Sequence, residues 1–119
     1  MQKKNELEKI SEVISRYNLK PKKSLSQNFL LDLNLTERIV NSMGQINNHD
    51  ILEIGPGPGA LTRSLLNLGA RKVIAIEKDS QFLGPLNEIS KAYPGRLEII
   101  NADVLSIDIE TFLNPPIKI

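Results

Sequence analysis

The sequence contains no cysteine and only one histidine, His49, among its 119 residues. Without cysteine the chain has no disulfides, no thiolate metal ligands and no cysteine nucleophile. His49 has no neighbour at metal-ligand spacing, so we interpret it as a surface loop residue and expect no metal site. Because apolar runs are far too short to span a membrane and no signal-peptide pattern is present, we expect a cytoplasmic protein that does not bind membranes.

Aromatic residues are also scarce, and charge is unevenly spread. Aromatic side chains make up only 4% of the chain, too few for a surface that stacks the bases of single-stranded nucleic acid. Residues 1–23 carry seven basic and three acidic residues, whereas residues 24–119 carry eight and eleven. We therefore divide the chain into an N-terminal helix with a basic arm, residues 1–23, and a mildly acidic body, residues 24–119. The basic arm indicates an anionic partner, or alternatively a solvated tail.

A glycine-rich turn follows the first apolar run of the body. Residues 50–54 have the pattern of a buried parallel strand, and residues 55–59 then read GPGPG. Leucines at helical spacing follow up to Gly69, which stands where a helix C-cap is expected. Strand, turn and helix form the first half of a βαβ nucleotide-binding unit, although the spacing G-x-G-x-G differs from the dinucleotide pattern G-x-G-x-x-G. The alternative is a glycine turn that binds no ligand.

Two acidic residues follow the next two predicted strands. Glu77 ends the apolar run at residues 73–76, where a nucleoside-binding βαβ unit holds the ribose hydroxyls. Asp103 follows the run at residues 97–100 and is suited to accept from an adenine amino group. Because ligands bind beyond the carboxyl ends of parallel strands, we expect both side chains at one site. The alternatives are an exposed surface Glu77 and an Asp103 that caps a short helix near residues 106–113.

The remaining periodic segments predict helices and a last strand. We predict a helix over residues 5–18, ended by the approach of Pro21, with Ile10 and Ile14 on its apolar face. A second helix is predicted from the apolar spacing of Leu35, Ile39, Val40 and Met43 and closes at Gly44, and a further helix covers residues 82–93. A fourth strand opens at residues 117–119, so we expect the sequence to be the N-terminal part of a longer protein.

Four motifs together resemble those of the rRNA adenine N6,N6-dimethyltransferases. They are QNFL at residues 27–30, LEIGPGPGALT at residues 52–62, EKD at residues 77–79 and NADVL at residues 101–105. The glycine loop looks more like the small-subunit (16S) branch than like the large-subunit methylases that confer macrolide resistance. The resemblance implies a Rossmann-like class I S-adenosylmethionine-dependent methyltransferase fold, an α/β architecture with a parallel sheet flanked by helices and cut at the fourth strand.

The same resemblance implies a cofactor, a substrate and site residues. S-adenosylmethionine would be held by Asn28 and Leu30 at its methionine and sulfonium end, Gly55 at the amino-acid moiety, Glu77 at the ribose and Asp103 at the adenine. The enzyme would methylate N6 of two adjacent adenosines in the 3′-terminal hairpin loop of 16S rRNA, within the precursor small ribosomal subunit (pre-30S). The basic arm would contact RNA phosphates.

The resemblance assigns no catalytic residue to this chain. In the family, the catalytic motif Asn-Leu-Pro-aromatic follows the fourth strand, which begins here at Ile117. We therefore expect these 119 residues to transfer no methyl group by themselves. Two other functions stay open: a non-catalytic RNA-binding or ribosome-assembly factor with the same fold, and a large-subunit rRNA adenine methyltransferase. An NAD-dependent dehydrogenase is disfavoured by the glycine spacing.

Overall fold

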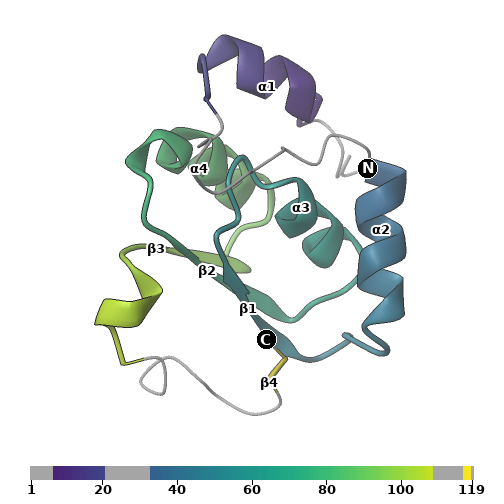
Figure 1. Ribbon diagram of the computed structural model, residues 1–119. Coiled ribbons are helices and arrows are strands. Elements are labelled where there is room, and N and C mark those ends of the chain that lie inside the picture. Colours follow the sequence, from purple (N-terminus) through teal and green to yellow (C-terminus); the bar gives the residue numbers. More distant parts are fainter. Residues whose placement is uncertain (1–6, 21–32, 109–116, 119) are drawn as a thin grey trace.

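Four parallel strands form a single sheet in the order β3-β2-β1-β4. The computed structural model describes residues 7–20, 33–108 and 117–118 (Figure 1). The strands are β1 (Asp50–Ile54), β2 (Lys72–Glu77), β3 (Leu97–Asn101) and β4 (Ile117–Lys118). Each of the four strands predicted from the apolar runs is present. β1 lies between β2 and β4, as expected for the first strand of a doubly wound sheet.

The α-helices of the described residues lie on one face of the sheet. They are α1 (Ile10–Arg16), α2 (Leu33–Ser42), α3 (Ala60–Asn67) and α4 (Leu83–Ala92). Two short 3-10 helices, η2 (Ser80–Phe82) and η3 (Val104–Ser106), follow β2 and β3. α3 and α4 pack on the strands, α2 lies beside α3, and α1 lies beyond α4 (Figure 1). None of the helices in the described part of the chain is both long and apolar enough to cross a membrane.

The strands separate two apolar clusters because successive side chains point to opposite faces. Ile51 and Val73 join the main core beneath α3 and α4, where Leu86 and Ile89 are fully buried. Leu52, Ile74 and Ile76 pack on the opposite face with residues of β3, η3 and the segment after it. Near-continuous burial along β1 and β2 agrees with the unbroken apolar runs that predicted these strands.

The first helix is shorter than predicted. α1 begins at Ile10, because Lys9 is extended, and ends at Arg16 instead of continuing to residue 18. Asn18 adopts a left-handed conformation with φ +54°, and the amide of Leu19 donates to the carbonyl of Ile14 at 3.0 Å. This Schellman-type ending stops the helix before Pro21 has any influence. The physical cause is therefore a local cap rather than proline.

Polar contacts fix α1 against α4. Nη2 of Arg16 donates to Oε1 of Glu88 at 2.8 Å, and the Tyr17 hydroxyl also donates to the Glu88 carboxylate. These contacts, together with the burial of Ile10 and Val13, dock the helix on the body. Within the described part of the basic arm, Arg16 is thus an anchoring residue and not part of a solvated tail.

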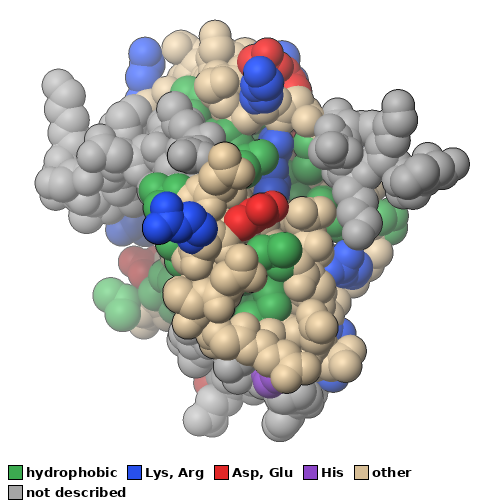
Figure 2. Space-filling view, turned by 90° about the vertical axis from the view of Figure 1, so that its right-hand side faces the viewer, with side chains coloured by type: hydrophobic (Ala, Val, Ile, Leu, Met, Phe, Trp, Pro, Cys, Tyr) green, Lys and Arg blue, Asp and Glu red, His purple; other side chains and the backbone are tan. Residues whose placement is uncertain are grey.

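The buried face of α2 agrees with the prediction only in part. Val40 is buried as predicted, whereas Leu35 and Ile39 are 41% and 37% exposed and Thr36 is buried instead. The Thr36 hydroxyl shares a buried 2.6 Å hydrogen bond with the Ser64 hydroxyl of α3, which sets the rotation of the helix. Figure 2 views the side on which α2 lies, and hydrophobic side chains reach its surface among charged ones. The apolar pattern of α2 alone could not reveal this pairing.

Candidate functional site

Strand register places the ends of β1, β2 and β3 side by side. Ile54 pairs with Ile76, and Glu77 pairs with Asn101. Beyond these pairs, the amide of Gly55 donates to the carbonyl of Ile76 at 2.9 Å, and the amide of Ala102 donates to the carbonyl of Glu77 at 3.1 Å. The glycine loop, Glu77 and the turn that carries Asp103 therefore share the carboxyl edge of the sheet, as the sequence predicts.

The three glycines of the loop have positive φ angles, and they serve two different purposes. Gly55 and Gly57 have φ angles of +70° and +56°, and no atom lies within 4 Å of the place a Cβ would occupy. The backbone there is open to a ligand that approaches closely. Gly59 has φ +98°, and a Cβ would overlap the side chain of Ile89 on α4. The first two glycines thus form a cradle, and the third allows α3 to pack on α4.

Glu77 is buried beneath this loop. Only 6% of the residue is exposed, so it is not the surface glutamate that the sequence left as an alternative. Oε1 accepts from the amide of Gly57 at 2.9 Å, and Oε2 accepts from the amide of Asp79 at 3.0 Å. Each carboxylate oxygen has two lone pairs and so retains capacity for one further donor. The side chain therefore orders the loop and could accept a diol at the same time.

Asp103 has a capping role in the structure. Its Oδ1 accepts from the amide of Leu105 at 3.0 Å and caps the 3-10 helix η3. Of the short helix predicted near residues 106–113, residues 109–113 lie outside the described residues, so that helix stays a prediction. Asp103 is exposed and stands two positions after Asn101, the partner of Glu77. The carboxylate of Asp103 therefore lies at the predicted edge of the sheet. It also caps a short helix, which was the alternative to a contact with adenine.

A second buried carboxyl group, Glu53, lies on β1 ahead of the loop. The hydroxyl of Thr62 on α3 donates to Oε1 of Glu53 at 2.5 Å. Burial raises the pKa of the Glu53 carboxyl to about 7; the hydrogen bond from Thr62 lowers it, and the charge of Glu77 raises it. Sequence analysis gave Glu53 no role. Its signal is a single acidic residue inside an otherwise apolar strand, which indicates burial with a specific partner.

We predict that Glu53→Gln flattens the dependence of stability on pH. The unfolded chain releases this proton near the ordinary pKa of 4.5 and the folded protein near 7, so the folded state binds more protons in between. The stabilisation is complete below pH 4.5 and is lost as pH rises through 7. Relative to wild type, the variant should gain up to about 3 kcal/mol between pH 4.5 and pH 8. Urea denaturation at several pH values measures this, and parallel pH profiles would contradict it.

The other predicted site residues are placed as follows. Asn28 and Leu30 lie outside the described residues, so their position stays a prediction. His49 lies in a loop, as predicted, and is partly exposed; its Nδ1 is 3.1 Å from the carbonyl oxygen of Asn47. Within residues 7–20, 33–108 and 117–118, no three His, Asp or Glu side chains form a group that could hold a metal ion.

Comparison with known proteins assigns a family to this site. Residues 18–117 match the family model described as ribosomal RNA adenine dimethylase. Over 110 residues, or 92% of the chain, the sequence is 57% identical to Ribosomal RNA small subunit methyltransferase A of Dinoroseobacter shibae. That alignment covers 39% of the relative, so the chain spans about two fifths of the length of the curated relatives it matches.

Two solved structures are similar in fold. The 23S rRNA methyltransferase ErmE is 35% identical with a TM-score of 0.60, over 75% of this chain and 34% of that one. Phosphoethanolamine N-methyltransferase 1 of Haemonchus contortus, crystallised with S-adenosylhomocysteine, is 25% identical with a TM-score of 0.58, over 83% and 22%. The fold is the Rossmann-like class I methyltransferase fold. The match to residues 18–117 shows that the chain belongs to the ribosomal RNA adenine dimethylase family.

Proposed function

We propose that the chain is the cofactor-binding half of an S-adenosylmethionine-dependent rRNA adenine N6,N6-dimethyltransferase. The observation that carries the proposal is the buried Glu77 carboxylate at the tip of β2, hydrogen-bonded to the open glycine loop. This arrangement suits a nucleoside whose ribose donates two hydroxyl hydrogens. The substrate would be N6 of two adjacent adenosines in the 3′-terminal hairpin loop of 16S rRNA, in the cytoplasm, during biogenesis of the small subunit (pre-30S). The 57% identity to Ribosomal RNA small subunit methyltransferase A of Dinoroseobacter shibae supports the small-subunit rRNA as substrate.

The residues at the carboxyl edge fit this cofactor. Gly55 and Gly57 leave space that a Cβ would fill, so a bound amino-acid moiety could contact their backbone. Glu77 would accept from the ribose hydroxyls, and the exposed Asp103 carboxylate would accept from the adenine amino group. Asn28 and Leu30 would complete the site at the methionine end. When bound, the cofactor supplies an electrophilic methyl group.

Methyl transfer is proposed for the whole protein. Within these 119 residues we assign no catalytic residue, and we propose that they bind the cofactor without transferring its methyl group. The large-subunit alternative is less favoured, because identity to the small-subunit relative is 57% whereas identity to ErmE is 35%. The basic arm would contribute phosphate contacts that are independent of RNA sequence.

Calorimetric titration tests the cofactor assignment. We expect the 119-residue chain to bind S-adenosylhomocysteine with saturation and to show no heat of binding with NAD, because the glycine spacing is G-x-G-x-G. A chain that binds NAD, or neither compound, would overturn the proposed function. A methyl-transfer assay of the full-length protein on immature small and large ribosomal subunits would then distinguish the two rRNA substrates, because only the true substrate should be methylated.

A further inference from the structure

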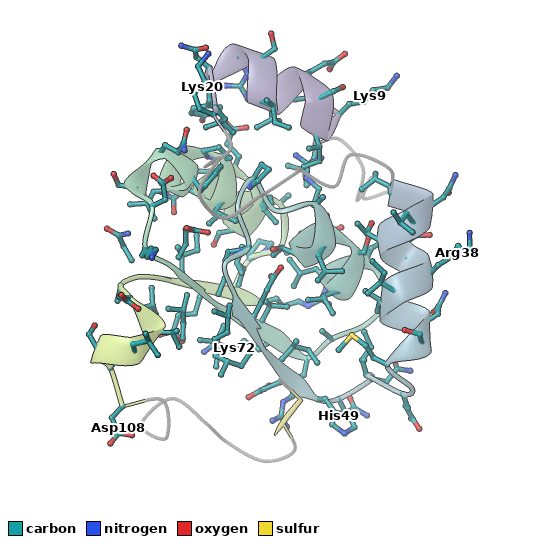
Figure 3. All side chains as sticks on the ribbon, in the orientation of Figure 1. Lys9, Lys20, Arg38, His49, Lys72 and Asp108 are labelled. Carbon is teal, nitrogen blue, oxygen red and sulfur yellow. The ribbon has the colours of Figure 1, made fainter. Side chains whose placement is uncertain are left out.

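The side-chain amide of Gln81 holds the main chain of Lys20, 61 residues earlier. Its Oε1 accepts from the amide of Lys20 at 3.0 Å, and its Nε2 donates to the carbonyl of the same residue at 3.0 Å. A carboxamide that pairs with both groups of one peptide residue imitates a strand pairing. Lys20 lies at the end of α1 nearest to α4 (Figure 3), so this contact joins the N-terminal helix to the turn after β2.

The same amide continues toward the site. The side-chain Nε2 of Gln81 also donates to Oδ2 of Asp79 at 2.8 Å. The backbone N–H of Gln81 donates to Oδ1 of Asp79 at 3.1 Å. The amide of Asp79 in turn donates to Oε2 of Glu77, whose other oxygen accepts from Gly57. A continuous series of hydrogen bonds therefore runs from the end of α1 to the glycine loop.

α1 depends on such contacts for its position. With seven residues it is too short to be stable as an isolated helix. Ile10 and Val13 bury its apolar side, and Glu88 holds Arg16 and Tyr17. Those contacts join α1 to α4. Gln81 instead joins Lys20, just past the end of α1, to the turn after β2 that carries Asp79.

We propose that Gln81 is a positioning residue that couples the docking of α1 to cofactor binding at Glu77. The inference rests on the proposed function, since it requires a ligand at Glu77. A ligand that donates hydrogen bonds to the Glu77 carboxylate favours the ordered turn at Asp79. The ordered turn in turn favours the contact between Gln81 and Lys20. Because coupling between two binding events is reciprocal, a docked α1 must raise affinity for the cofactor to the same degree.

The test compares Gln81→Met with Gln45→Met. Methionine keeps the length of the side chain and removes both polar groups, and Gln45 is an exposed glutamine in the loop after α2. Titrated with S-adenosylhomocysteine, Gln81→Met should show a Kd raised by roughly three- to tenfold, whereas Gln45→Met should match wild type. Gln81→Glu, which loses the donor and repels Asp79, should bind at least as weakly as Gln81→Met.

Amide hydrogen exchange supplies a readout that packing alone would not change. In wild type, S-adenosylhomocysteine should slow exchange at the amides of Tyr17 and Leu19, which close the end of α1. In Gln81→Met this ligand effect should disappear. An unchanged Kd in Gln81→Met, or ligand-induced slowing equal to that of wild type, would overturn the coupling and leave the proposed function intact. Failure of wild type itself to bind would overturn the proposed function and the coupling with it.

Discussion

Glu77→Gln is expected to raise the Kd for S-adenosylhomocysteine by roughly two orders of magnitude, the largest binding effect at this site. The carboxylate has two acceptor oxygens, and both are already aligned by the amides of Gly57 and Asp79. Glutamine has one acceptor oxygen. If that oxygen serves Gly57, the NH₂ group meets the Asp79 amide, which is also a donor. The variant therefore loses charge-assisted hydrogen bonds to the ribose and the order of the turn that would present them.

Glu98→Gln is the matched control for this prediction. Glu98 lies on β3 of the same sheet, pairs with Ile74 in register, and forms an ion pair with Lys72 at 3.0 Å, away from the carboxyl edge. We expect its Kd to equal that of wild type in the same calorimetric titration. If Glu77→Gln binds as tightly as Glu98→Gln, the ribose assignment is wrong even though Glu77 is buried.

The sheet could be predicted from sequence because its signals are local. Each of the first three strands is an apolar run without proline, and each is followed by a residue that ends it, as Glu77 ends β2. Parallel order follows from the helices between these strands, so the shared edge of Gly55 and Glu77 required no knowledge of tertiary contacts. Burial of Glu77 was also consistent with its predicted function.

What could not be predicted depends on contacts between distant segments. The rotation of α2 is set by the hydroxyl pair of Thr36 and Ser64, which a hydrophobic pattern does not contain. The pKa of Glu53 depends on its burial beside Thr62. The role proposed for Gln81 rests on hydrogen bonds to Lys20. A glutamine and a lysine that stand 61 residues apart form no motif that a sequence would reveal.

Gly59→Ala is expected to destabilise the fold by about 2–5 kcal/mol, a large part of the stability of a small domain. The φ angle of +98° is unfavourable for alanine, at a cost of about 1–3 kcal/mol. The added methyl group would overlap the Ile89 side chain and lie 3.2 Å from Cδ2 of Leu86, where both residues are fully buried. Overpacking of this kind costs a further amount of about 1–3 kcal/mol. Urea denaturation followed by circular dichroism measures the loss.

Gly57→Ala separates the two causes within the same loop. Its φ of +56° also disfavours alanine, but no atom lies within 4 Å of the added Cβ. We therefore expect a loss of only about 1 kcal/mol from backbone strain. Equal losses in the two variants would show that contact with Ile89 contributes nothing, and that α3 can move away from α4 without cost. A loss at Gly59 that exceeds the loss at Gly57 by more than the difference in backbone strain, up to about 2 kcal/mol, would instead show that the third glycine is required for helix packing.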